Sequence, residues 1–338
     1  MQPVMIPAPA ATRQPTPWQA LWREAFRDPV ELLEALSLPN LASRLSASAK
    51  STFPLRVPRG YVARMRCGDP ADPLLRQVLP MDDEDRIAPG FGFDAVGDAA
   101  AKTGSGVIHK YQGRALLIAT GSCAIHCRYC FRRHFPYAEE SAAANGWTSA
   151  LDCLRAAPSV HEVILSGGDP LSLSTAKLAE LSDALRNFPQ ITRLRIHTRL
   201  PIVLPERIDG EFIDWVGTLS WPLVMVLHAN HGNEIDESVR NACAALRGRN
   251  VHLLDQAVLL RGVNDDADAL VALSEALFKA GVLPYYLHLL DRVQGSAHFE
   301  VPEAEALALR DAIHARLPGF LVPRLVREIA GGTGKSLL

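Results

Sequence analysis

The sequence predicts an α/β fold in which a parallel sheet curls into a barrel or partial barrel behind a mostly helical N-terminal segment. From residue 114 onward, six apolar strand-like runs alternate with amphipathic helical stretches. This alternation favours a parallel sheet with right-handed helical crossovers. The 338 residues are 48% hydrophobic, which is enough for a large buried core. Functional side chains are then expected in the loops that follow the carboxyl ends of the strands.

The chain divides into three expected parts: a mostly helical segment over residues 1–105, the barrel over 106–330 and a glycine-rich tail over 331–338. The Pro/Ala-rich start predicts a poorly ordered lead-in, and Thr16 is a suitable N-cap for a first helix that begins at Pro17. In the barrel, strands are expected at 114–120, 161–167, 193–198, 223–229, 251–259 and 285–290. Helices are expected at 174–188, 235–248 and 266–281.

Charge and hydropathy exclude several classes of protein. Lys+Arg is 35 and Asp+Glu is 37, a formal net charge of −2, so no nucleic-acid partner is expected. No apolar run approaches the roughly 20 residues that a membrane span needs, and the start lacks the pattern of a secretory signal. We therefore expect a cytoplasmic protein in a reducing compartment, where clustered cysteines favour metal or redox chemistry over disulfides. The isolated Cys67, Cys153 and Cys243 are expected to be small buried side chains.

The stretch "GSCAIHCRYCFRRHF" (121–135) follows the first expected barrel strand and holds Cys123, Cys127 and Cys130. Thiolates at this spacing can bind three irons of a cubane cluster and leave the fourth iron open to a small molecule. A structural zinc site is an alternative, but only His126 or His134 could complete it, in or beside the same tight loop. A redox C-x-x-C pair is another alternative, and it would leave Cys123 unused.

Two glycine-rich stretches are further candidates. "LSGGDPL" (165–171) ends the second expected strand, where glycines let a ligand approach the backbone, although the same letters also suit an ordinary strand-to-helix turn. "GGTGK" ends at Lys335 near the C-terminus. Lys335 could be a solvated side chain on a frayed tail, or an amine that bonds to the aldehyde of pyridoxal phosphate (PLP).

The C-x3-C-x2-C spacing, with Tyr129 before the last cysteine, resembles the radical S-adenosylmethionine (SAM) superfamily, which implies a [4Fe–4S] cluster, SAM and a partial (βα)6 barrel. Across residues 90–335 the chain resembles the lysine 2,3-aminomutase family, which uses PLP as well and moves the α-amino group of lysine to the β-carbon. The matching stretches are "YQGRALLIATGSCAIHCRYCFRRHF", "VILSGGDPL", "TRLPIVLPERI", "HANHGNEI", "QAVLLRGVND", "YYLHLLDRVQGSAHF" and "GGTGK".

The resemblance implies a role for each matching residue. Cys123, Cys127 and Cys130 would bind the cluster, and the Gly167–Gly168–Asp169 motif would contact the SAM amino group, with Asp169 in place of the commoner glutamate. Lys335 would bind PLP, and Arg132 would bind the substrate carboxylate with its planar fork. Asp291 and Glu328 would bind the far ammonium of the substrate. Arg114 and Gln256 would lie near the PLP phosphate and the substrate.

Glu328 stands where the family usually has an aspartate, so the ammonium pocket could be shaped differently. The chain stops three residues after Lys335, without the cysteine-bearing extension of the fermentative enzymes. This short form resembles the branch that makes (R)-β-lysine from (S)-α-lysine for a ligase that modifies elongation factor P.

Several alternatives stay open at this stage. One alternative is a mutase for another amino acid, such as glutamate, or for lysine in catabolism or osmolyte synthesis. A non-catalytic iron–sulfur protein is another. The sequence also leaves open whether the chain forms homo-oligomers and whether its substrate is free lysine or lysine attached to a carrier.

Overall fold

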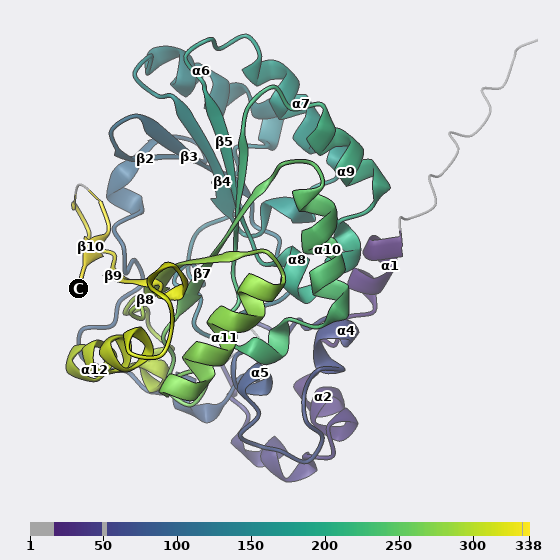
Figure 1. Cartoon of the computed structure of the whole chain (residues 1–338), viewed down its shortest axis with the longest axis vertical. Helices are drawn as coiled ribbons and strands as arrows, with labels where there is room; N and C mark the ends of the chain where they lie inside the picture. The colour runs from purple at the N-terminus through teal and green to yellow at the C-terminus, as the bar shows by residue number, and fades with distance from the viewer. Residues whose placement is uncertain (1–16, 49–52, 333) are drawn as a thin grey trace, which may run out of the picture.

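The computed structural model describes residues 17–48, 53–332 and 334–338. The expected lead-in and the Thr16 cap lie outside these residues. The described chain forms one ten-stranded sheet whose spatial order, β1 to β10, is also the sequence order. The longer helices that connect the strands lie on the outer side of the curved sheet (Figure 1).

The centre of the sheet consists of the six expected strands. They are β3 (Arg114–Thr120), β4 (Glu162–Gly167), β5 (Arg193–Thr198), β6 (Leu223–Leu227), β7 (His252–Val258) and β8 (Leu283–His288). Each pairs in parallel with the next. The helices between and after them are α6 (Thr148–Ala156), α7 (Thr175–Leu185), α9 (Gly210–Gly217), α10 (Glu237–Arg247), α11 (Ala267–Lys279) and α12 (Glu303–His314). The predicted partial barrel of six strand–helix units is confirmed.

The edges of the sheet were not anticipated. At one edge β1 (Lys102–Gly104) and β2 (Val107–Tyr111) add to β3 as antiparallel strands. At the other, β9 (Arg324–Arg327) pairs in parallel with β8, and β10 (Ser336–Leu337) pairs antiparallel with β9. Within the described residues no strand pairing joins β1 to β10, so the barrel is open along this seam.

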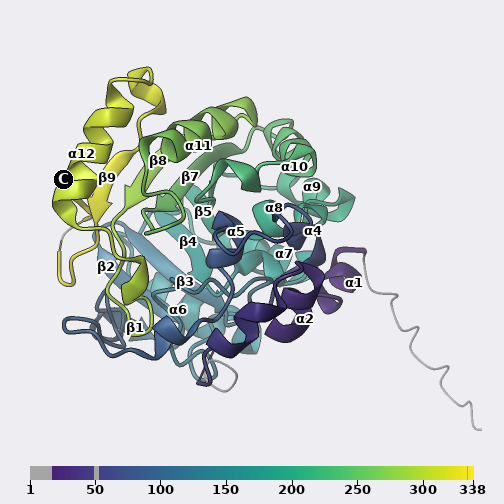
Figure 2. The same ribbon diagram turned by 90° about the horizontal axis from the view of Figure 1, so that it is seen from below.

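The N-terminal segment is made of short helices that begin at, or directly after, a proline or an aspartate. Asp28 and Asp72 accept hydrogen bonds from the first backbone amides of α2 and α5, and a proline follows each of them. The helices are α1 (Pro17–Arg23), α2 (Pro29–Ala35), η1 (Pro39–Arg44), α4 (Arg59–Val62), α5 (Pro73–Arg76), η2 (Asp82–Asp85) and η3 (Ala99–Ala101). In Figure 2, α1 and α2 lie at one side and α5 lies toward the middle of the barrel. Apolar side chains of this segment belong to the same hydrophobic core as the barrel.

Short helical turns complete the connections of the barrel. They are η4 (Ala144–Trp147), η5 (Pro170–Ser172), α8 (Leu200–Val203), η6 (Pro205–Arg207), η7 (Gly232–Glu234), η8 (Ala297–Phe299) and η9 (Gly319–Leu321). Among the described helices, none has the length and apolar character to cross a membrane. The expectation of burial is confirmed for Cys243, but Cys153 is half-buried and Cys67 is exposed because it lies in a surface turn beside Gly68.

Candidate active site

The cysteine loop leaves the carboxyl end of β3 and is fastened to the N-terminal segment. Arg56 Nη1 donates to the carbonyl of Cys123 over 3.2 Å, and the amide of Arg128 donates to the carbonyl of Gln77 over 2.9 Å. The thiols of Cys123, Cys127 and Cys130 are half-buried and free of disulfides. Burial, with the neighbouring cysteines, raises the pKa of Cys123 and raises that of Cys130 to about 11. Three grouped thiols of this kind need a cationic centre before they ionise together.

The donor set fits a cubane cluster. In the described part of the chain, no group of three or more His, Cys, Asp or Glu side chains is arranged around a single metal ion. A cubane does not require that arrangement, because each cysteine binds a different iron. His126, one of the two candidate zinc ligands, has its Nδ1 2.7 Å from the carbonyl oxygen of Pro54, and its ring stacks on Phe53.

The buried carboxylate of Glu84 forms ion pairs with two arginines of the cysteine loop, Arg128 and Arg133. Glu84 in η2 accepts from both Arg128 Nε, at 2.7 Å, and Arg128 Nη2, and it accepts from Arg133 Nη2 at 2.7 Å. Arg128 is fully buried between Cys127 and Tyr129. Because a buried charge without a partner is costly, the pairing fixes where this loop can lie.

Arg199, which follows β5, also contacts the cysteine loop. Its Nη1 lies 2.8 Å from Cys127 Sγ, and its Nη2 lies 2.9 Å from Glu234 Oε2 and 2.6 Å from Gln77 Oε1. The guanidinium therefore supplies positive charge to a cysteine sulfur. Sequence reasoning missed this role, although Arg199 lies in the stretch "TRLPIVLPERI".

The Gly-Gly-Asp motif packs against the start of the cysteine loop. Gly167 has φ +110, and a Cβ on Gly168 would lie 2.6 Å from the carbonyl oxygen of Ser122, so only glycine fits there. Asp169 is buried, and its carboxylate already accepts from Thr198 Oγ1 and from the amides of Leu171, Arg199 and Leu200. Asp169 thus joins the end of β4 to the end of β5. The backbone amides of Gly168 and Asp169 donate to the carbonyls of Thr120 and Ser122, so they fasten the motif to the start of the cysteine loop.

Lys335 lies on a β-hairpin and not on a frayed tail. β10 follows it directly, the amide of Leu338 donates to the carbonyl of Leu325 over 3.1 Å, and Arg310 Nη1 donates to the carbonyl of Leu338. Lys335 Nζ points inward, 3.3 Å from Glu328 Oε2 and 3.1 Å from His288 Nε2. Burial lowers the pKa of Lys335, which favours the neutral amine that attacks carbonyl carbons.

The two predicted acidic residues are near Lys335. Glu328 also accepts from the hydroxyl of Tyr111, and Lys110 Nζ lies 3.9 Å from it. Burial raises the pKa of Asp291 to about 7, and Glu328 adds to this rise, whereas the charge of Lys335 opposes it. The structure thus brings Asp291, Glu328 and Lys335 into one electrostatic group, with Tyr111 and Lys110 as members that sequence reasoning missed.

Arg132 connects this group with the cysteine loop. It follows Cys130 by two residues, and its Nε donates to Asp98 Oδ2 over 2.7 Å while Nη1 donates to Ser166 Oγ over 3.0 Å. Asp98 Oδ1 in turn lies 2.7 Å from Lys110 Nζ. Asp98 is a further residue that the sequence did not single out.

Arg114 and Gln256 lie on the inner strands, each with a buried polar atom that has no hydrogen-bond partner. These atoms are Arg114 Nε and Gln256 Oε1. The Arg114 guanidinium lies 4.6 Å from the centre of the Tyr111 ring, and Gln256 is paired in register with Tyr286. His197 Nε2 and His228 Nε2 are buried and unpartnered as well. Because buried polar groups are normally satisfied, this interior fits a polar group such as a phosphorylated pyridine.

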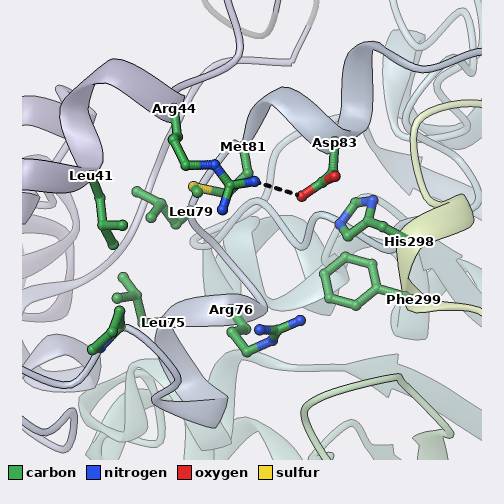
Figure 3. Close-up of a pocket in the computed structure, with 10 residues that line it drawn as sticks. Leu41, Arg44, Leu75, Arg76, Leu79, Met81, Asp83, His298 and Phe299 are labelled. Atoms are coloured by element: carbon green, nitrogen blue, oxygen red, sulfur yellow. Dashed lines mark hydrogen bonds and ion pairs between the residues drawn. The ribbon is translucent and has the colours of Figure 1, made fainter.

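A separate cavity of about 130 Å³ lies between the N-terminal segment and η8 (Figure 3). Its wall includes the Arg44–Asp83 ion pair, 3.1 Å long, and the rings of His298 and Phe299. None of the predicted site residues lines it. The cysteine loop, the Gly-Gly-Asp motif and Asp291 follow the carboxyl ends of β3, β4 and β8, whereas Arg114 is the first residue of β3 and Gln256 lies within β7.

Known proteins resemble this chain in structure and in sequence, although no protein-family model matches it. Among solved structures, a radical SAM methyltransferase from Sphaerobacter thermophilus aligns over 65% of this chain and 68% of its own, with a TM-score of 0.47 and 16% identity.

Relatives in sequence cover nearly the whole chain. It is 45% identical to the L-lysine 2,3-aminomutase of Haemophilus influenzae over 98% of both chains. It is 48% identical to that of Escherichia coli over 95% of this chain and 94% of the relative, and 32% identical to that of Clostridium subterminale over 93% and 77%. The chain therefore belongs to the L-lysine 2,3-aminomutase family, a family of isomerases.

Proposed function

We propose that the chain is an L-lysine 2,3-aminomutase that converts (S)-α-lysine to (R)-β-lysine with a [4Fe–4S] cluster, SAM and PLP. The supporting observation is a continuous chain of contacts. It runs from the cysteine loop through Arg132, Asp98 and Lys110 to Glu328 and Lys335. This chain of contacts supports a single site in which the three cysteines would bind the cluster and Lys335 would bind PLP.

The cofactors would divide the chemistry between them. Cys123, Cys127 and Cys130 would hold three irons, and the open fourth iron would bind SAM beside the backbone of Gly167 and Gly168. Together the cluster and SAM would supply the chemistry that removes a hydrogen atom from the substrate, and PLP on Lys335 would supply an electron sink. Arg114 and Gln256, each with a buried polar atom that has no hydrogen-bond partner, would lie near the PLP phosphate and the substrate.

The substrate would be held at both ends. Arg132 would bind its carboxylate, because a guanidinium presents a planar fork that suits two carboxylate oxygens. Asp291 and Glu328 would bind the far ammonium. Both carboxylates would repel the side chain of glutamate, so they favour lysine over that alternative substrate.

For the cellular role, we propose that β-lysine passes to the ligase that modifies elongation factor P in the cytoplasm. The resemblance of the sequence to that branch of the family supports this role.

The activity test is anaerobic reconstitution with iron, sulfide, PLP, SAM and dithionite, followed by chiral analysis of the products formed from L-lysine. We expect (R)-β-lysine together with 5′-deoxyadenosine. A cluster that forms without yielding 5′-deoxyadenosine would favour a non-catalytic iron–sulfur protein. β-Glutamate from L-glutamate, with no β-lysine from lysine, would favour another aminomutase.

Lys335→Ala should abolish β-lysine formation, whereas Lys279→Ala, at the solvent-exposed end of α11, should leave it unchanged. Adding the ligase and elongation factor P should then give a mass increase of one β-lysyl group on the factor. Absence of that increase, with active ligase and β-lysine present, would refute the cellular role alone.

A further inference from the structure

His288 has no assigned role, yet it contacts the nitrogen of Lys335. It is the last residue of β8, only 4% exposed, and its Nε2 lies 3.1 Å from Lys335 Nζ. Its backbone is fixed from both sides, because it pairs with Val258 on β7 and Val326 on β9. The imidazole therefore has a defined position beside the amine.

Lys335 must lose a proton before it can bond to an aldehyde, because only the neutral amine has a free lone pair. The carboxylate of Glu328, 3.3 Å from Nζ, favours the charged ammonium instead. Glu328 is also the group to which we assign the substrate ammonium. Another group is needed to take the proton from Lys335.

The surroundings of this pair decide which group can do so. Several charged and titratable groups surround Lys335. They are Arg195 and His197 on β5, His228 after β6, Tyr286 and His288 on β8, Asp291 after β8, and Glu328 after β9. Burial, and then the charge of Lys335, lower the pKa of His288. The imidazole is therefore neutral at neutral pH and has a lone pair available on one ring nitrogen.

The charge of Lys335 is one reason why His288 resists protonation. A transfer from Nζ to Nε2 moves that charge over 3.1 Å and removes the repulsion in the same step. The negative charge of Glu328, 3.3 Å from Nζ, stays close to the proton throughout. His228 adds little repulsion, because burial lowers its pKa to about 3 and it stays neutral.

We infer that His288 accepts the proton that Lys335 gives up when Lys335 bonds to the aldehyde of PLP. The inference rests on the proposed function, in which Lys335 carries PLP. In this step the ammonium of Lys335 passes one proton to His288 Nε2, and the freed lone pair forms the nitrogen–carbon bond. The aldehyde oxygen leaves as water with the two hydrogens that remain on Nζ, and His288 later releases its proton to solvent.

The test measures the rate of PLP attachment and needs no turnover. Protein freed of PLP is mixed with PLP at a series of pH values, quenched with borohydride at set times, and the adduct on Lys335 is quantified by peptide mass spectrometry. His288→Gln can still hydrogen-bond but cannot take a proton. We expect attachment to slow by about 100-fold at pH 7, at the lower end of general-base effects, and to recover as the pH rises.

His288→Ala, with and without added imidazole, provides a second variant. Imidazole should restore much of the rate if proton transfer is the role of His288. His298→Gln, which removes an imidazole outside the site, should attach PLP at the unaltered rate.

Unchanged rates and pH dependence in both His288 variants would overturn the inference. So would slower attachment with an unchanged pH dependence and no rescue by imidazole, which would indicate a purely structural role. No adduct on Lys335 in the unaltered chain would instead refute the proposed function.

Discussion

Replacing Asp291 with asparagine should stabilise the substrate-free chain and weaken its binding of lysine at the same time. Burial raises the pKa of this carboxyl from its ordinary value of 3.8 to about 7. The ionised form is thus disfavoured in the fold until a cation arrives. Asparagine resembles the protonated acid in shape and charge, so it removes this penalty and also removes the charge that would attract the substrate ammonium.

The size of the effect follows from the shift. One pKa unit corresponds to about 1.4 kcal/mol, so the shift of roughly three units costs on the order of 4 kcal/mol at pH 8. Between pH values of about 4 and 7 the native state binds more protons than the unfolded state, so stability falls as pH rises through that window. The gain in the free energy of unfolding from Asp291→Asn should reach its full value above pH 7 and be about 2 kcal/mol at pH 5. For a chain of this length, 4 kcal/mol corresponds to a rise in Tm of about 6 °C.

The assay is anaerobic thermal unfolding of the substrate-free protein at pH 8 and pH 5, together with the KM for lysine. Loss of one partner from a buried charge pair costs about 2–5 kcal/mol, so the KM at pH 8 should rise by at least about 30-fold. Asp268→Asn is the matched control, because Asp268 is 88% exposed and pairs with Arg316 on the surface. A lower or unchanged Tm at pH 8 would refute the burial argument, and an unaltered KM would refute the ammonium role.

Three further substitutions test the rest of the site. Glu84→Gln should lower the iron content of reconstituted protein several-fold, because breaking a buried charge pair costs about 3–5 kcal/mol. Glu300→Gln, at the surface, should retain its iron. Equal iron content in both variants would contradict the role of Glu84 in holding the cysteine loop. Arg199→Lys keeps the charge but loses the fork that contacts a cysteine sulfur, so an EPR-monitored titration should show a changed cluster potential; an unchanged potential would contradict that contact. Arg132→Lys should raise the KM for lysine while the iron content is kept, since an ammonium lacks the planar fork; an unaltered KM would argue against the carboxylate role.

The parts of the fold that the sequence predicted are those with a strong local pattern. β3 (Arg114–Thr120) has the predicted bounds, and α7, α10 and α11 lie within their predicted ranges. Long apolar runs and capped amphipathic helices carry enough periodicity to be recognised alone. The cysteine spacing is equally local, since three thiols within eight positions must share one loop.

The partners of the site residues were not predictable in this way. Glu84 is 44 residues from Arg128, and Arg199 is 72 residues from Cys127. No local pattern links residues so far apart, and each charged side chain alone resembles a solvated surface group. Their pairing depends on how the N-terminal segment and β5 meet the cysteine loop.

By itself, then, the sequence determined the parallel strand–helix alternation, the three-thiol loop at the end of β3 and the candidate amine at Lys335. Only the tertiary structure decided that Lys335 faces the interior, because β10 has two residues and no periodicity of its own. Its pairing with β9 turns the tail inward and brings Nζ beside Glu328 and His288. Local patterns specify which elements form, whereas burial and long-range pairing specify which side chains meet.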